Sequence, residues 1–452
     1  MKKTLYYRLW LACLGYCLIF LIAACRGSTY TTGQTATPTH HTPSVGATPG
    51  TGGIFPIPPT QPSSRKGTTS PVVQSTSVDC PAIGTARAAV TTPLTLGNHQ
   101  VLSYVYSQNT GEQGEYTAIR LYDITSGSKT DIIKWNDTTL SNLSNAQISK
   151  DGQWILFAAQ TSNATKIQMV RVDGQDLQTL YCPPASQSVS DLLWSPDQKS
   201  VIFSLTTSTN SGPSFSGIDL LDIMDGIIQQ ELGAQASLSP GLVMWLDNTK
   251  VYLTDEGGAS PGTENIYLLD TSKDAPQKLT DLQHVATATV PPCGDFDKSL
   301  DGTQLLLSHC SLNQKGHPTT PSTITIQPAT GDPVHVIYKS RDLAIFEMRV
   351  ISSTTLLLLV QNDTDTTLNG LWKMNIDGTN LTRLSSDNKL IGDDWFAHTM
   401  TSWSNVSRDG TLYSFQQEQG PVEVLVFGSL AGGILKPVED AGNQDVIGWT
   451  TM

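Results

Sequence analysis

Charged residues are scarce in this chain of 452 residues. They make up 15% of it, and because 40 acidic residues outnumber 27 basic ones, the formal net charge is −13. Contact with nucleic acid or with an anionic membrane surface needs clustered Lys and Arg, because both present closely spaced phosphates. We find no such cluster in the sequence. We therefore expect no nucleic-acid partner.

Long helical patterns are also missing, and short hydrophobic strands take their place. From Asn145 to Thr451 the chain repeats a strand, a polar turn with Asp, a second strand, and a later strand that ends in a turn such as Asp-Gly. A period of roughly 40–50 residues built from short strands is typical of propeller blades. We predict an all-β fold, a β-propeller of about seven four-stranded blades. The first turns of the clear copies carry Asp151, Asp197, Asp247, Asp301 and Asp409.

The two ends of the repeat array are complementary. The first unit begins directly at a second strand, Val101 to Tyr106, without the first strand that other copies have. The chain finishes with Asp445 to Thr450, which has the character of that missing first strand. We predict that this last strand pairs into the first blade and closes the ring, which removes both sheet edges. A truncated eighth blade is the alternative.

The N-terminus has the features of a lipoprotein signal. Three Lys and Arg residues fall within the first eight positions, an apolar stretch runs from Leu9 to Ile22, and Ala23, Ala24 and Cys25 follow. The pattern resembles a bacterial lipobox, in which Cys25 is lipidated and becomes the first mature residue. We predict a signal peptide over residues 1–25. A plain transmembrane anchor with an incidental cysteine is the alternative, although the apolar run is short for one.

Residues 26–79 are mostly Thr, Pro, Ser and Gly. Such a segment cannot bury enough apolar surface to offset the entropy lost on ordering, so we predict a disordered, partly extended stalk. The propeller domain is then expected over residues 80–452. The chain is predicted to consist of a lipid anchor, a stalk and a propeller head.

The repeats also point to a family. The copies at Asp151-Gly152, at Ser195-Pro196-Asp197 and around Asp377 resemble the PD40, or WD40-like, repeats of TolB-type β-propellers. The resemblance covers residues 97–452. It implies the propeller fold. The chain departs from TolB in its long stalk, in a count of about seven blades where that family has six, and in showing no N-terminal α/β domain.

Most repeated polar and aromatic residues have a structural explanation. Asp in the first turns normally accepts hydrogen bonds from backbone amides two residues on, so we assign no metal site to them. Large rings near these turns are expected to pack between blades. They are Trp154, Trp194, Trp245, Trp403 and Trp449. Trp395 and Phe396 interrupt the repeat pattern, and we predict that they form an exposed ligand contact.

The sequence offers no residue on which to place catalysis, and it implies no cofactor. Oligogalacturonate lyases hold a metal through a histidine cluster on a propeller. The histidines here come from different blades and loops, without metal-ligand spacing, and we expect them to be scattered. They are His284, His309, His317, His335 and His398. Prolyl oligopeptidases also carry propellers, but their nucleophile belongs to an α/β-hydrolase domain of roughly 200 further residues, for which this chain has no room.

Four cysteines follow Cys25, and they allow three pairings. A two-residue turn at Asp301-Gly302 would place Cys293 opposite Cys310 on adjacent antiparallel strands, within reach of a disulfide. Cys80 and Cys182 then pair by elimination. A zinc site is the alternative, although no Cys-x-x-Cys sequence supports it.

These features favour a lipid-anchored β-propeller of the cell envelope, attached to the outer face of the cytoplasmic membrane or to the outer membrane. We expect a non-catalytic module that binds a protein, peptide or glycan partner at the propeller face. One alternative is a lyase or glycosidase that works in the channel. Another is an envelope-organising protein like TolB.

Overall fold

The computed structural model describes residues 73–74, 79–87, 94–108, 116–136, 142–161, 164–209, 212–234, 240–255, 263–289, 294–314, 318–362, 365–385, 405–419, 422–440 and 442–452. The chain divides into two units, Met1–Gly67 and Thr68–Met452, and all of the described residues belong to the second. None of the helices in these ranges is both long and apolar enough to cross a membrane.

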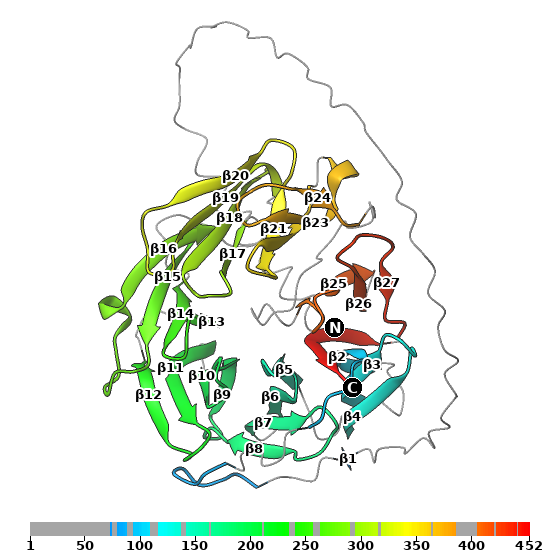
Figure 1. Ribbon diagram of the computed structural model, residues 1–452. Coiled ribbons are helices and arrows are strands. Elements are labelled where there is room, and N and C mark those ends of the chain that lie inside the picture. Colours follow the sequence, from blue (N-terminus) through cyan, green and yellow to red (C-terminus); the bar gives the residue numbers. More distant parts are fainter. Residues whose placement is uncertain are drawn as a thin grey trace, which may run out of the picture. The chain divides into compact units, whose positions relative to one another are not determined.

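Seven β-sheets stand around a ring, so the protein is a seven-bladed β-propeller, as the repeat predicted (Figure 1). Consecutive strands pair antiparallel within each blade, for example β9 with β10 and β10 with β11. Within the described ranges, the short 3-10 helices η2 (Leu279–Asp281) and η3 (Thr366–Leu368) lie in connections. The architecture is therefore all-β, and each repeat supplies one sheet.

The strands occupy equivalent positions from blade to blade. In blades 1 to 6 the strands next to the channel are β28 (Asn443–Thr451), β5 (Asn142–Ile148), β9 (Gln187–Trp194), β13 (Gly241–Trp245), β17 (Gly294–Lys298) and β21 (Ile345–Val350). The second strands of blades 1 to 7 are β2 (Gln100–Gln108), β6 (Trp154–Gln160), β10 (Ser200–Thr209), β14 (Lys250–Asp255), β18 (Gln304–Leu312), β22 (Thr355–Val360) and β25 (Leu412–Gln419). In blade 7 the innermost described pairing is a bridge between Val406 and Tyr413.

The outer half of each blade is equally regular. The third strands are β3 (Tyr116–Asp123), β7 (Thr165–Arg171), β11 (Gly212–Asp222), β15 (Thr263–Asp270), β19 (Pro318–Pro328), β23 (Gly370–Asn375) and β26 (Val422–Ser429). The outer strands are β4 (Lys129–Asn136), β8 (Gln178–Tyr181), β12 (Ile228–Gly233), β16 (Gln283–Thr289), β20 (His335–Ser340), β24 (Thr382–Arg383) and β27 (Lys436–Pro437). In blade 1 a further strand, β1 (Val73–Gln74), pairs in parallel with β4. This strand lies within the range predicted to be a stalk, and sequence reasoning missed it.

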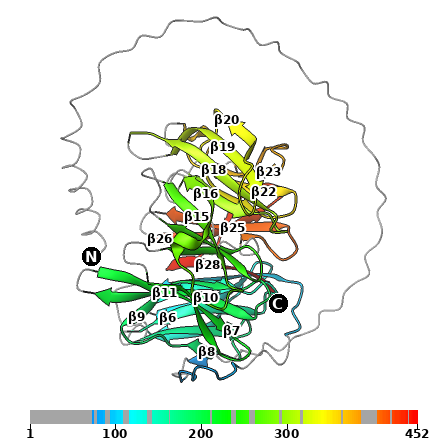
Figure 2. The same ribbon diagram turned by 90° about the vertical axis from the view of Figure 1, so that its left-hand side faces the viewer.

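The C-terminal strand closes the ring, as predicted. β28 pairs antiparallel with β2, with Trp449 opposite Leu102. The Trp449 side chain is fully buried, and its indole Nε1 donates to the Ser414 hydroxyl of blade 7 at 2.9 Å. β28 thus joins the first blade to the last, and Figure 2 shows it in red beside β26.

An arginine from blade 7 strengthens this closure. The Arg408 guanidinium donates to the carbonyl oxygens of Trp449, Lys150 and Ser149 at 3.0, 2.6 and 2.9 Å. These acceptors belong to blades 1 and 2. Gly152 suits this place because its φ is +76°, and a Cβ here would lie 2.4 Å from Arg408 Nη2, so the guanidinium would have to shift. One side chain therefore connects three blades where the two ends of the array meet.

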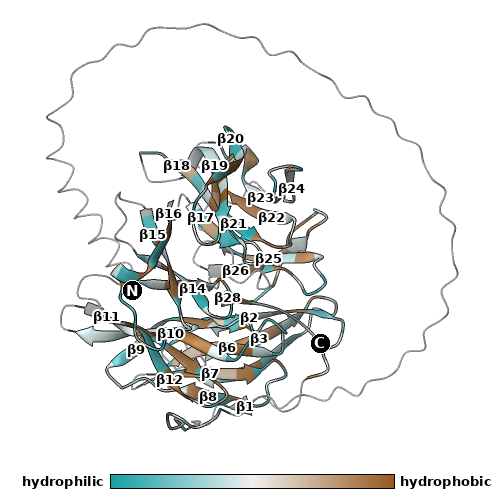
Figure 3. Cartoon of the chain, turned by 60° about the vertical axis from the view of Figure 1, so that its left-hand side comes forward, coloured by the Kyte–Doolittle hydropathy of each residue, from teal (hydrophilic) through white to brown (hydrophobic). Residues whose placement is uncertain are grey.

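Apolar side chains pack between neighbouring blades rather than within each blade. Seven clusters of buried hydrophobic residues are found among the described residues, and each spans one junction of the ring. Hydrophobic residues accordingly lie along the strands in Figure 3. Trp154, Trp194, Trp245 and Trp449 are at most 8% exposed, which confirms their predicted packing, whereas Trp403 lies outside the described residues.

The turn aspartates have the structural role that was predicted. Asp151, for example, accepts from the backbone N–H of Gln153 at 3.0 Å and from the hydroxyl of Ser149 at 2.5 Å. The Ser149 hydroxyl in turn accepts from Trp154 N at 3.0 Å. The corresponding backbone bond, from the residue two positions on, is made by Asp197, Asp247, Asp301 and Asp409.

Candidate functional site

A cavity of about 350 Å³ lies where the inner strands of blades 1 to 4 face the channel. β5, β9, β13 and β28 supply its walls. Its polar lining consists of Asn142, Ser144, Asn145, Asp191 and Asp445, and its apolar lining consists of Leu143, Ala146, Leu192, Leu193, Leu242, Val243 and Val446. None of these residues is Lys, Arg or His. A pocket of this size suits one or a few side chains or sugar units.

Asp191 is the most constrained acid of the cavity. Its Oδ2 accepts from the hydroxyl of Ser204 and from the backbone N–H of Leu242 in blade 4, the latter at 3.4 Å. The Ser204 hydroxyl also accepts from Asp191 N at 3.0 Å and lies 2.8 Å from the Ser190 hydroxyl. Burial raises the pKa of Asp191, and its hydrogen bonds oppose this rise only in part.

The repeat explains why a polar residue stands at this point. Asp191 lies four residues before the first-turn Ser195, and Asn145 and Asp295 lie equally far before Ser149 and Ser299. All three bind the backbone of the next blade. Asn145 donates to Ser190 O at 3.0 Å, and Asp295 accepts from Met348 N at 2.9 Å. These side chains fasten each inner strand to its neighbour, a role that the spacing could have indicated.

On the other side of the ring the carboxylates are sealed. Asp295 and Asp297 of β17 are 5% and 4% exposed, and Arg349 of β21 is 4% exposed. Arg349 donates to Asp295, and Val350 N donates to Asp297 at 2.8 Å. Burial raises the pKa of Asp297 to about 6, although the nearby guanidinium opposes the rise. These acids cannot reach a substrate, so we assign them to the joint between blades 5 and 6.

A further acid lies at the outer end of the junction between blades 3 and 4. Glu231 of β12 is fully buried, and neither carboxylate oxygen has a hydrogen-bond partner among the described residues. Burial, with help from Asp270 and Asp219, raises the pKa of Glu231 to about 8. Burial likewise raises the pKa of Asp219 to about 6. Glu231 is closed to solvent and Asp219 is half-buried, so we assign no catalytic role to this pair.

Other predicted residues are scattered or lie outside the described ranges. His284 and His335 are exposed on the outer strands β16 and β20, and His309 is half-buried on β18, where burial lowers its pKa. Trp395 and Phe396, together with Cys25, His317 and His398, lie outside the described residues, so the ligand contact and the lipidation stay predictions. In the described part of the chain, no three of the His, Cys, Asp and Glu side chains form a group that could hold a metal ion.

A short motif also falls outside the described part. Residues Gly258 to Gly262 read Gly-Ala-Ser-Pro-Gly, which has the spacing of a nucleophile elbow and which sequence reasoning overlooked. The elbow requires a strand before the serine and a helix after it. Here the string connects β14 to β15, two strands of one antiparallel blade. The strand β15 follows the serine where the elbow needs a helix, so the motif does not indicate a hydrolase.

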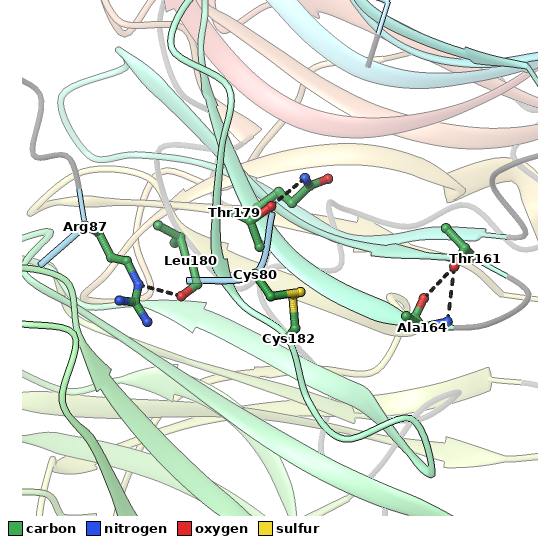
Figure 4. The surroundings of a disulfide bond; sticks show 8 residues. Cys80, Arg87, Thr161, Ala164, Thr179, Leu180 and Cys182 are labelled. Carbon is green, nitrogen blue, oxygen red and sulfur yellow. Dashed lines mark hydrogen bonds between the residues drawn. A yellow bond between two sulfur atoms is a disulfide. The ribbon is translucent and has the colours of Figure 1, made fainter. Parts of the chain in front are cut away.

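The disulfide between Cys80 and Cys182 is present, as predicted (Figure 4). It ties the start of the described N-terminal segment to the loop after β8. Arg87 extends the connection, because its Nε donates to Leu180 O at 2.6 Å and its backbone N–H donates to Ile223 O at 3.0 Å. Residues 79–87 therefore clasp the outer edges of blades 2 and 3.

The second predicted disulfide is tested only through its register. Phe296 pairs with Leu307 and Gly294 with His309, as the turn at Asp301-Gly302 predicted. Cys310 is disulfide-bonded. Cys293 lies outside the described residues, so its pairing with Cys310 stays a prediction that fits this register.

Comparisons with known proteins find similarity in the fold but not in the sequence. No model of a protein family matches the sequence, and no curated protein matches it. An oligogalacturonate lyase in complex with manganese aligns over 73% of this chain and 96% of its own, with 11% identity and a TM-score of 0.49. TolB from Acinetobacter baumannii aligns over 76% of this chain and 81% of its own, with 13% identity and a TM-score of 0.41. A prolyl endopeptidase aligns over 76% of this chain and 50% of its own, with 11% identity and a TM-score of 0.49. These likenesses concern the fold alone, and the seven sheets of this chain are those of a β-propeller.

Proposed function

We propose that the protein is a lipid-anchored β-propeller of the cell envelope that binds a protein, peptide or glycan partner at its channel without chemically changing it. The observation that carries the proposal is the cavity formed by the inner strands of blades 1 to 4. Its walls combine amides, a hydroxyl and carboxylates with apolar side chains, a composition suited to holding a ligand in one orientation.

The bonding of the acids supports binding rather than catalysis. Glycosidases use two carboxyl groups that reach the substrate from opposite sides. Asp191 uses one oxygen to hold blade 4, and Asp295 and Asp297 are buried beside Arg349. These three acids thus serve the joints between blades. Release of sugar or of unsaturated oligogalacturonides by the full chain would refute the non-catalytic part of the proposal.

The cellular setting is supported by the disulfide. Cys80–Cys182 fits an oxidising compartment, because cytosolic proteins rarely keep such bonds. The anchor rests on the lipobox-like residues before Cys25. Replacing Cys25 with Ser should abolish lipid labelling and signal processing. Unchanged processing and membrane partitioning would refute the anchor.

The binding proposal is tested by capture from membranes with the full chain in detergent. Ser144 lines the cavity and makes no hydrogen bond through its hydroxyl among the described residues, so Ser144→Trp should fill the cavity at little cost to the fold. Ser126→Trp, in an exposed turn of blade 1, is the matched control. A partner that the wild type and Ser126→Trp retain, and that Ser144→Trp loses, supports the proposal. Equal capture by all three refutes the channel as the binding site.

A further inference from the structure

The cavity has a one-sided charge. Asp191 and Asp445 stand on two of its walls, β9 and β28, and none of the described residues that line it carries a positive charge. The chain as a whole has a formal net charge of −13. Carboxylates set in a concave wall of low dielectric concentrate the negative potential at its mouth, which attracts cations and repels anions.

Asp191 keeps an unused acceptor. Both of its bonds to the protein, from Ser204 and from Leu242 N, are made to Oδ2. Nothing among the described residues donates to Oδ1. Because the residue is only half-buried and lines the cavity, this oxygen is available to a ligand that donates hydrogen bonds.

The remaining lining suits the stem of a long side chain. Ala146 and Val243 are half-buried apolar residues on the walls, while Asn142 and Ser144 add neutral polar groups. Lysine and arginine carry an apolar stem below a charged head, so both parts of such a side chain would find complementary surface. A sugar acid or an acidic peptide would bring its charge next to two carboxylates.

We infer that this cavity admits the side chain of a lysine or arginine from a peptide or protein partner, with its charged head directed at Oδ1 of Asp191. The inference rests on the proposed function, since it specifies the partner chemistry of the same site. It assigns Asp191 two tasks, one for each oxygen: Oδ2 fastens blade 4 and Oδ1 faces the ligand.

The test uses four capped pentapeptides that differ only in the central residue, Ala-Ala-X-Ala-Ala with X as Lys, Arg, Gln or Glu. Their binding to the full chain is measured by calorimetry or by NMR at low salt. The Lys and Arg peptides should bind, and the Gln and Glu peptides should not. Raising the salt should weaken the binding of the cationic peptides, because the attraction is electrostatic.

Charge-removing variants locate the site. Asp191→Asn keeps an oxygen that can accept from Ser204 and Leu242 N but loses the charge. It should weaken the binding of the Lys and Arg peptides by at least about tenfold, the contribution expected of a charged hydrogen bond. Asp445→Asn should act in the same direction. Asp225→Asn makes the same change of charge at the exposed turn between β11 and β12, which does not line the cavity. It should leave binding unchanged.

Each outcome of these experiments either supports or overturns the inference. Equal binding of the four peptides, a preference for the Glu peptide, no binding of any of them, or equal loss in the Asp191→Asn and Asp225→Asn proteins would overturn the inference. If Asp191→Asn does not fold, the salt dependence of the wild type and the Asp445→Asn protein carry the test. Capture of the membrane partner separates the two proposals. If Ser144→Trp loses the partner while Asp191→Asn and Asp445→Asn keep it, the channel binds a partner but not through a cationic side chain.

Discussion

Asp191 and Asp295 occupy the same position of the repeat and have opposite surroundings. Each lies four residues before the first-turn serine of its blade, and each accepts a backbone N–H from the next inner strand. Asp295 is 5% exposed and is paired with Arg349. Asp191 is half-buried, has no cation beside it among the described residues, and lines the cavity. One position of the repeat therefore provides a sealed joint in one half of the ring and a joint with a ligand-facing oxygen in the other.

Deleting Asp445 to Met452 should have the largest effect on this comparison, since it removes one wall of the cavity and opens the ring. The deletion removes the buried side chains of Val446, Ile447, Trp449 and Thr450, and β2 becomes an edge. We expect a loss of more than about 5 kcal/mol of stability and a tendency to aggregate. Thermal unfolding and size-exclusion chromatography of the truncated and intact chains measure both. A truncated chain that melts with the intact one and stays monodisperse would contradict the closing-strand role.

Removing Arg349, the cation of the sealed joint, should cause the second largest loss of stability. Arg349→Met leaves Asp295 and Asp297 buried without their partner, which we expect to cost about 3–5 kcal/mol. Arg341→Met, at an exposed site just before β21, is the control and should change stability little. Denaturant unfolding of the two variants gives the difference. Similar midpoints would mean that the buried carboxylates are compensated by other groups.

Glu231 extends the comparison of Asp191 with Asp295. Like Asp191, it is an acid at the junction of blades 3 and 4 with no cation beside it among the described residues. Its folded pKa of about 8 lies above the ordinary value of 4.5, so the folded protein holds the proton more tightly than the unfolded chain does. The wild type should therefore lose stability as the pH rises from about 4.5 to about 8, by on the order of 2–4 kcal/mol in total.

Glu231→Gln should be more stable than the wild type at pH 8 and equal to it at pH 4. Asp219, with a folded pKa of about 6, adds a smaller slope of the same sign below that pH, and this part should persist in the variant. Unfolding midpoints across this pH range provide the test. Parallel pH profiles for the two proteins would show that Glu231 is solvated or paired.

The smallest expected effect is that of Asp191→Asn on stability. The amide oxygen can replace Oδ2 as the acceptor, so the loss should be about 1 kcal/mol or less. Asp295→Asn, the same change at the same repeat position, should cost about 3 kcal/mol because it breaks the buried pair with Arg349. Denaturant unfolding of the two proteins compares them directly. Equal losses would show that the two positions do not differ as their surroundings indicate.

The fold could be predicted from the sequence because it repeats. Each copy shows the same turn chemistry, as at Asp151 and Asp197, and the unmatched ends at Val101 and Trp449 revealed how the ring closes. The hairpin register around Asp301 followed from the length of its turn. These are local signals, and a repeat presents them many times.

The cavity could not be predicted in the same way, because it depends on contacts between blades. Asp191 and Asp445 are 254 positions apart in the sequence and meet only when the ring is closed. Nothing in the sequence next to Asp295 shows that Arg349, from the following blade, will seal it. The two-residue strand β1 was missed because it is too short to carry a periodic signal.

The clasp at Cys80 determines how the head would bear mechanical load. If the chain is tethered through Cys25, a pull on the stalk first meets the two-residue pairing of β1 with β4. Once that pairing has opened, the load passes at Cys80 through the disulfide to Cys182, at the outer edge of blade 2. The covalent bond relieves the residues that follow Cys80 of this load, and Arg87 holds them to blades 2 and 3 through its hydrogen bonds. The closing strand, held only by non-covalent contacts, is thereby kept out of the line of force, so the ring can stay shut while its anchor is pulled.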